Sequence, residues 1–233
     1  MRRTNLLLAT AVAMAIATSA GASVVTNGGF ETNGPPAPGS GDYSIGSTQI
    51  TGWTVINNDG STTDNGHNII WIGNGAYGLY TPFGNDFLDL TGTTDQTPFS
   101  GVSQTLTTVS GQSYALTFDL GAQGSSGIFG GPISATASAG STSDTFSFDG
   151  ASGTNANGTF WTPETLNFTA TSTSTVISIV GNTGQEFIGL DNVSVATAGG
   201  VPEPASWALM LVGFGGLGAA LRGSRRKQAH AVV

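Results

Sequence analysis

The chain of 233 residues is long enough for one β-rich domain of ordinary size once its ends are set aside, and its lack of cysteine excludes disulfides and thiolate metal sites. Its formal net charge is −8, but all six Lys and Arg lie at the two ends, and of the 14 Asp and Glu only Glu203 lies outside residues 23–200. That middle segment has no Lys or Arg that could neutralise a phosphate, so we expect no nucleic-acid partner.

The first 22 residues have the pattern of a secretory signal peptide. Arg2 and Arg3 precede an apolar stretch, and the small residues that follow fit a cleavage site between Ala22 and Ser23. The apolar stretch is too short to span a bilayer comfortably, so we expect export and removal of this segment. An N-terminal anchor helix is the alternative.

Short runs of alternating polar and apolar residues predict β-strands between residues 23 and 200. The clearest run is SYALTFDLG, in which Tyr114, Leu116 and Phe118 share one face. Other expected strands lie at 50–57, 68–73, 86–92, 101–108, 143–150, 164–170 and 174–180. Glycine-rich loops are expected at 33–42, 121–132 and 149–159. Eight to ten short strands without a helical pattern predict an all-β, antiparallel sandwich, jelly roll or barrel.

The order of short motifs along this segment carries a resemblance. The motifs are NGGFE at 27–31, GWTV at 52–55, GVSQTL at 101–106, GQSYALTF at 111–118 and IGLDNVSV at 188–195. In this order they are similar to the galactose-binding-like jelly rolls, a group that includes many carbohydrate-binding modules. The resemblance covers most of residues 24–196 and implies a jelly-roll β-sandwich.

Two acidic residues fall at the ends of that pattern. The first and last strands of such jelly rolls lie close together, which would bring Glu31 near Asp191. Because no Lys or Arg is available to pair with them, calcium, which prefers hard oxygen ligands, suits the two carboxylates. The resemblance implies the same structural calcium, held by an acid of the N-x-G-F-E segment and an Asp of the final D-x-V strand. Solvation, or capping of backbone amides, is the alternative.

The strand that contains Asp191 changes phase within its own length. Ile188 and Leu190 share one parity, whereas Val193 and Val195 share the other. Such a break predicts a β-bulge near Asp191 and Asn192, and a bulge can re-aim a side chain.

Aromatic residues near glycine-rich turns are candidate platforms for sugars, because the faces of pyranose rings are apolar. The candidates are Trp71, Tyr77, Tyr80 and Trp161. Packing in the core or within loops is the alternative for each of them.

We expect no catalytic site. Asp86 and Asp89 lie three residues apart, so within a strand they face opposite sides and cannot flank one glycosidic bond. His67 is the only histidine between residues 23 and 200, and no nucleophile motif accompanies it.

The C-terminal residues have the parts of a sorting signal. Pro202, Glu203 and Pro204 precede an uncharged apolar stretch at 205–221, which falls slightly short of the ~20 residues that span a bilayer, and a basic cluster follows it. Together with Trp207 and Ala208, this order resembles the PEP-CTERM sorting domain in its PEP-x-x-W-A variant. The resemblance implies that Pro202, Glu203 and Pro204 are recognised by an exosortase-type processing enzyme, in Gram-negative bacteria that make extracellular polysaccharide. A plain membrane anchor is the alternative.

The sequence therefore predicts three parts: a signal peptide at 1–22, a β-sandwich domain at 23–198 and a sorting signal at 199–233. We expect an exported, non-catalytic protein of the cell envelope, cell surface or biofilm matrix, whose jelly roll binds polysaccharide and whose tail contacts the inner membrane transiently. Two alternatives stay open: a purely structural acidic surface component, and a secreted hydrolase or lyase that acts on glycans.

Overall fold

The computed structural model describes residues 25–124, 127–198 and 214. The expected signal peptide, its cleavage position at Ala22 and Ser23, and the motif Pro202-Glu203-Pro204 lie outside these residues. Within the described part of the chain, no helix is long and apolar enough to cross a membrane. The fold described below is that of residues 25–198, and the expected all-β antiparallel sandwich is confirmed.

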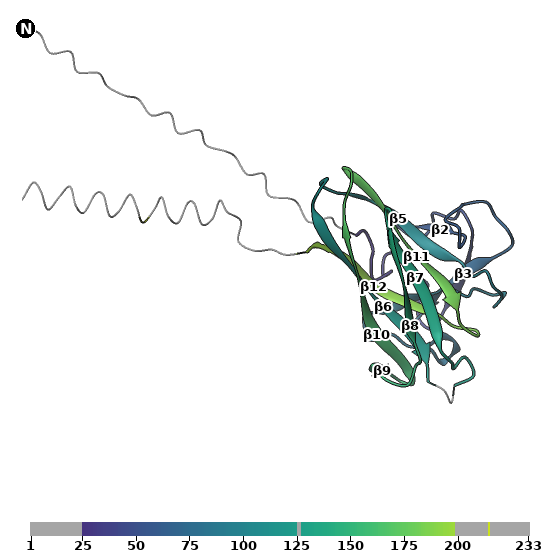
Figure 1. Cartoon of the computed structure of the whole chain (residues 1–233). Helices are drawn as coiled ribbons and strands as arrows, with labels where there is room; N and C mark the ends of the chain where they lie inside the picture. Colours follow the sequence, from purple (N-terminus) through teal and green to yellow (C-terminus); the bar gives the residue numbers. More distant parts are fainter. Residues whose placement is uncertain (1–24, 125–126, 199–213, 215–233) are drawn as a thin grey trace, which may run out of the picture. The chain divides into compact units, whose positions relative to one another are not determined.

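Twelve strands and one short 3-10 turn make up the described domain (Figure 1). They are β1 (Ser40–Ser44), β2 (Thr54–Ile56), β3 (Asn68–Gly73), η1 (Ala76–Gly78), β4 (Asp86–Asp89), β5 (Gly101–Thr107), β6 (Ser113–Gln123), β7 (Ile133–Ala139), β8 (Thr142–Phe148), β9 (Thr154–Ala156), β10 (Thr159–Thr169), β11 (Ser174–Thr183) and β12 (Gly189–Thr197).

The strands form two antiparallel sheets. One has seven strands in the order β1-β3-β4-β12-β6-β10-β9, and the other has five in the order β2-β5-β11-β7-β8. The last strand, β12, therefore lies between β4 and β6 in the middle of the larger sheet. This central position brings the end of the domain next to segments from its beginning.

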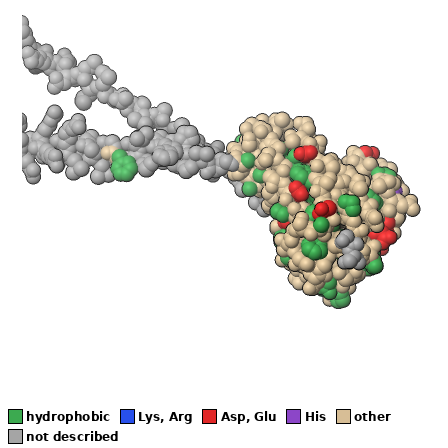
Figure 2. All heavy atoms as spheres, turned by 60° about the horizontal axis from the view of Figure 1, so that its bottom comes forward, with side chains coloured by type: hydrophobic (Ala, Val, Ile, Leu, Met, Phe, Trp, Pro, Cys, Tyr) green, Lys and Arg blue, Asp and Glu red, His purple; other side chains and the backbone are tan. Residues whose placement is uncertain are grey.

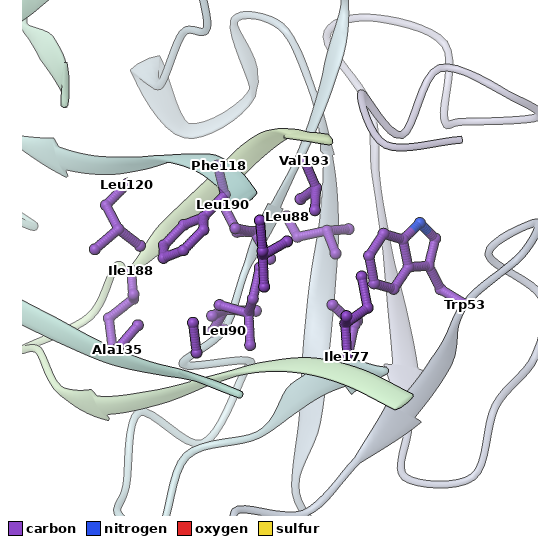
Figure 3. Close-up of a cluster of buried hydrophobic side chains, with 14 of the residues drawn as sticks. Trp53, Leu88, Leu90, Phe118, Leu120, Ala135, Ile177, Ile188, Leu190 and Val193 are labelled. Carbon is purple, nitrogen blue, oxygen red and sulfur yellow. The ribbon is translucent and has the colours of Figure 1, made fainter. Parts of the chain in front are cut away.

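Alternation along the strands decides which side chains enter the core. In β11, Ile177 and Ile179 are buried, whereas the side chain of Val176, the residue before Ile177, is 51% exposed. Successive strand residues point to opposite faces of a sheet, so the two isoleucines face the other sheet and Val176 faces outward. Figure 3 shows the resulting core, in which Leu88, Phe118 and Leu190 meet Ile177 and other side chains of the facing sheet.

A second apolar cluster covers the outer face of the seven-stranded sheet. It contains Ile70, Ile72, Phe87, Trp161 and Phe187, covered by Ala76 and Leu79 from the segment between β3 and β4. The larger sheet is therefore buried on both faces near its centre, which explains why β4 has no exposed residue.

Trp161 fits on this outer face because glycines lie beneath its ring. A Cβ atom on Gly121 would lie 2.7 Å from the indole Cη2 atom, and one on Gly189 would lie 2.9 Å from it. Real Cβ atoms need more room than this, so glycine at both positions leaves space for the indole against the sheet.

Some expected loops contain strands. The loop expected at 33–42 already holds the start of β1, and the loop expected at 149–159 holds β9. β7 follows the expected loop at 121–132, and the sequence pattern did not predict this strand. β1 and β9 are short edge strands with polar sequences, and β7 alternates small Ala with Ser and Thr, so pairing with neighbouring strands defines them better than hydrophobic periodicity does.

Candidate metal centre and sugar-binding surface

The segment NGGFE lies against β12, as the sequence predicts. The backbone N–H of Val193 donates to the carbonyl oxygen of Gly28 at 2.8 Å. A Cβ atom on Gly28 would collide with the carbonyl oxygen of Val193, so only glycine fits at this close approach. The expected proximity of the first and last segments is confirmed.

The expected β-bulge is also present in β12. Asp191 pairs with Asp119 of β6, but the register then shifts so that Ser194 pairs with Thr117. Asn192 sits at the shift with a φ of 53°, a left-handed conformation that asparagine tolerates, and its side-chain amide donates to Asp119 Oδ2 at 2.9 Å.

Glu31 reaches from the N-terminal segment to the start of β4. Its Oε1 atom accepts hydrogen bonds from the backbone N–H groups of Asn85 at 2.7 Å and Asp86 at 2.9 Å. A Cβ atom on Gly84 would collide with this carboxylate, so the close approach requires glycine there. Part of the alternative interpretation, capping of backbone amides, is thus present in the structure.

Asp191 is fully buried next to Glu31. Its Oδ2 atom accepts from the hydroxyl of Thr81 at 2.5 Å, and its Oδ1 atom accepts from the N–H of Asn192 at 2.6 Å. Burial raises the pKa of Asp191 to about 7 against the lowering effect of these hydrogen bonds, and the charges of Glu31 and Asp119 raise it further. A Cβ atom on Gly29 would lie 3.8 Å from Glu31 Cγ and 3.9 Å from Asp191 Oδ1, so both acids border one small space.

A third carboxylate, which sequence reasoning did not assign to this cluster, is that of Asp86. The residue is buried, and its Oδ1 atom has no hydrogen-bond partner among the described residues. Burial raises the pKa of Asp86 to about 6, and the neighbouring charge of Glu31 adds to the rise. The only signal in the sequence is an acid at the start of an apolar strand, which does not reveal its closeness to Glu31.

Glu31 therefore lies near both Asp86 and Asp191, and we call these three acids the carboxylate cluster. An ionised carboxylate that is buried without a partner is costly, and an oxygen-seeking cation would offset that cost. Across residues 25–124 and 127–198, no three His, Cys, Asp or Glu side chains are arranged to hold a metal ion by themselves. An ion in this space would therefore also need backbone carbonyl oxygens or water as ligands.

The two tryptophans proposed as sugar platforms are core residues. Trp71 and Trp161 are both almost completely buried, and their indole N–H groups donate to the carbonyl oxygens of Phe30 at 3.1 Å and Tyr80 at 2.8 Å. A sugar cannot stack on a ring that protein atoms cover on both faces, which corrects the expectation for these two residues. Tyr77 is 54% exposed and Tyr80 is half-buried, so these two tyrosines remain as candidate platforms for a sugar.

Tyr77 borders a pocket of about 220 Å³ on the outer face of the seven-stranded sheet. Apolar side chains form one side of it, and three acids, Asp89, Asp95 and Glu186, also line it. Figure 2 shows red acidic side chains among green hydrophobic ones on one face of the domain, without a blue basic side chain. Tyr77 has a φ of 55°, a conformation that a bulky side chain rarely adopts, and its hydroxyl lies 2.9 Å from the hydroxyl of Ser40.

Asp89 titrates abnormally because it is buried. Its Oδ1 atom accepts from the N–H and hydroxyl of Thr91 at 3.0 and 2.9 Å and from the N–H of Ile188 at 3.1 Å. Burial nonetheless raises the pKa of Asp89 to about 7 from an ordinary value of 3.8. Between these two values the folded state binds more protons than the unfolded state.

We expect Asp89→Asn to flatten part of the pH dependence of stability. Because the folded pKa is raised, the contribution of Asp89 is fully present below about pH 4 and is lost as pH rises through about 7. The free energy of unfolding should fall by at most about 1.4 kcal/mol per pH unit in that window through this group, and the variant should lack this part. Urea unfolding at pH 4.5 and 7.5 measures it. An unchanged difference between the two pH values in the variant would contradict the assignment.

The fold and site define a β-sandwich domain that precedes a C-terminal sorting signal. Residues 200–227 match the model of the PEP-CTERM protein-sorting motif. A motif of this kind implies an exported protein, and this part of the sequence prediction is confirmed. No curated protein matches the sequence.

Solved structures with a similar fold include carbohydrate-binding modules, an adhesin domain and two glycosidases. The CBM22-1 xylan-binding domain from Paenibacillus barcinonensis Xyn10C is 12% identical, with 72% of this chain and 99% of that chain covered and a TM-score of 0.38. A family 61 module in complex with β-1,4-galactotriose is 15% identical, with 76% and 99% covered and a TM-score of 0.38.

The K1 cleaved adhesin domain of Lys-gingipain from Porphyromonas gingivalis W83 is 17% identical, with 69% of this chain and 99% of that chain covered and a TM-score of 0.41. Because these TM-scores lie below 0.5, the function of this chain has to be argued from its own residues.

Proposed function

We propose that the chain is an exported, non-catalytic protein of the cell envelope or extracellular matrix, processed at its C-terminal motif, and that its β-sandwich domain binds polysaccharide. The observation that carries this proposal is the match of residues 200–227 to a protein-sorting motif. This motif follows a folded β-sandwich domain in the sequence. A signal that directs a protein outward supports a role for the domain among the glycans of the cell surface.

The distribution of charge supports this role. Every Lys and Arg lies at residues 2–3 or 222–227, so the domain between them carries only negative charge. The basic residues after the apolar stretch would hold the tail on the cytoplasmic side of the inner membrane until an exosortase-type enzyme acts at Pro202, Glu203 and Pro204.

The surface around Tyr77 supports polysaccharide binding. An exposed aromatic ring offers an apolar face, and the acids lining the same pocket accept hydrogen bonds from hydroxyl or amine groups. A pocket that combines apolar side chains with a few polar groups is the usual form of a small-ligand site. In a non-catalytic protein these acids would bind the sugar through hydrogen bonds and would not transfer protons to it.

Within the same proposal, calcium stabilises the domain structurally at the carboxylate cluster. Glu31 lies near both Asp86 and Asp191, and the Oδ1 atom of Asp86 has no hydrogen-bond partner among the described residues. Bound calcium would supply positive charge that offsets the repulsion between these carboxylates, while backbone carbonyl oxygens and water complete its shell.

Two measurements on the full chain test the proposed function. In a Gram-negative host with an exosortase-type enzyme, the wild-type chain should be exported and shortened, whereas the triple variant P202A/E203A/P204A should stay at its unprocessed mass. The full chain should also be retarded in gels that contain extracellular polysaccharide. Equal processing of the triple variant, or no retardation by any polysaccharide, would overturn the corresponding part, and release of reducing ends or unsaturated products would overturn the non-catalytic role.

A further inference from the structure

The pocket beside Tyr77 has two chemically different sides. Ile70 and Ile72 of β3, with Leu79, Tyr77 and Phe129 from the covering segments, supply apolar surface. Asp89 at the end of β4, Asp95 in the following loop and Glu186 just before β12 supply carboxylates. These residues come from distant parts of the sequence, and the outer face of the seven-stranded sheet brings them together.

Asp89 presents an unused acceptor to this pocket. The residue is only 3% exposed, and all three of its hydrogen bonds fall on Oδ1. Among the described residues no donor reaches Oδ2, and Asp89 lines the pocket, so Oδ2 is the atom left for a ligand. A ligand amine at this atom would donate to it in place of water.

The charge of the pocket is not compensated by the protein. The Thr91 hydroxyl lies 2.9 Å from Asp89 Oδ1 and 3.2 Å from Asp95 Oδ1, so a single hydroxyl hydrogen is shared between two carboxylates. Burial raises the pKa of Asp95, and the charge of Glu186 also opposes its ionisation. Since residues 23–200 contain no Lys or Arg, a positive charge here has to come from a ligand.

The shape of the pocket favours an organic cation over a metal ion. An apolar surface faces its carboxylates, whereas a metal ion needs oxygen ligands on all sides. An ammonium group can lie near carboxylates while the ring that carries it packs on Tyr77, and aromatic rings attract such cations. A volume of about 220 Å³ suits a single small ring rather than a long ligand.

We propose that this pocket binds an amino-sugar unit with a free ammonium group, its amine against Asp89 Oδ2 and its ring against Tyr77. This inference rests on the proposed polysaccharide binding and specifies the sugar class. The same carboxylates would repel uronic acids and sulfated sugars, so the pocket selects a cationic polysaccharide.

Calorimetric titration of the full chain at neutral pH with two matched probes tests this proposal. The probes are the trimer of β-1,4-linked glucosamine and the trimer of N-acetylglucosamine, which differ only in the charge and substitution of the amine. The glucosamine trimer should bind at least about tenfold more tightly, because a charge-assisted hydrogen bond to a buried carboxylate is lost in the other probe. Its affinity should fall with added salt.

Three variants locate the binding. Asp89→Asn, which keeps the shape of the side chain, and Tyr77→Asn, which tolerates the positive φ of that position, should each weaken the glucosamine trimer about tenfold or more. Asp144→Asn removes the same charge from an exposed position of β8 and should have no effect. Circular dichroism melting of each variant shows whether the fold is kept.

The outcomes separate this inference from the proposed function. Equal affinity for the two trimers, or glucosamine binding that survives Asp89→Asn, overturns the amino-sugar site, while retardation by polysaccharide still supports the proposed function. Pocket-dependent binding of the glucosamine trimer without retention by any polysaccharide supports the site and overturns polysaccharide binding. Loss of both signals overturns both.

Discussion

Replacing Trp161 by alanine is expected to lower the free energy of unfolding by about 3–5 kcal/mol. The indole is fully buried on the outer face of the seven-stranded sheet, with ring centroids 6.0 Å from Phe83 and 5.6 Å from Phe87. Its removal leaves a cavity above Gly121 and Gly189 that these glycines cannot fill. It also leaves the carbonyl oxygen of Tyr80 without its indole donor.

Trp161→Phe is the matched control for that cavity. The smaller ring keeps part of the packing but loses the indole N–H, so we expect a cost of about 1–3 kcal/mol, between wild type and alanine. Urea unfolding followed by circular dichroism measures both. If Trp161→Ala retains wild-type stability and loses polysaccharide binding, the ring is a binding platform rather than a structural one.

Calcium is expected to raise the melting temperature of the domain by roughly 5–10 °C. An ion present at about 100 times its dissociation constant adds about 2.7 kcal/mol to stability, and each kcal/mol raises the melting temperature of a domain of this size by about 2–4 °C. The physical reason is the carboxylate cluster, where burial has raised the pKa values of Asp86 and Asp191 to about 6 and about 7. A cation favours the ionised carboxylates that burial disfavours.

Asp86→Asn is the sharpest variant for this test. Asp86 Oδ1 has no partner among the described residues, so the substitution removes a negative charge next to Glu31 without breaking a hydrogen bond of that atom. The variant should lose most of the calcium-dependent rise, and Asp144→Asn should keep it. Scanning calorimetry with calcium and then with excess chelator measures both. An identical melting temperature in calcium and in chelator for the wild-type chain would remove the metal from the proposal.

The tryptophans show why sequence reasoning reached the fold more securely than the sugar surface. Trp71 and Tyr77 both lie near glycine-rich turns, and nothing local separates them. Trp71 is a residue of β3 whose side chain belongs to the main core, and Tyr43 of the neighbouring strand β1 packs against it at a centroid distance of 5.7 Å. Tyr77 lies in η1, which passes over the outer face and leaves the phenol exposed. Exposure depends on what covers a residue, and the covering segments are distant in sequence.

The sequence by itself determined the sandwich, the sorting motif and the bulge beside Asp191, and its resemblance to known jelly rolls predicted that Glu31 lies near Asp191. Alternation, short motifs and phase breaks are local properties of a chain, because side chains alternate along every strand. Only the tertiary structure decided that Asp86 joins Glu31, that Trp71 and Trp161 are buried, and that Asp89, Asp95 and Glu186 share a pocket with Tyr77. Those outcomes depend on how loops cross the outer face of a sheet, and close packing between distant segments, rather than local pattern, determines that path.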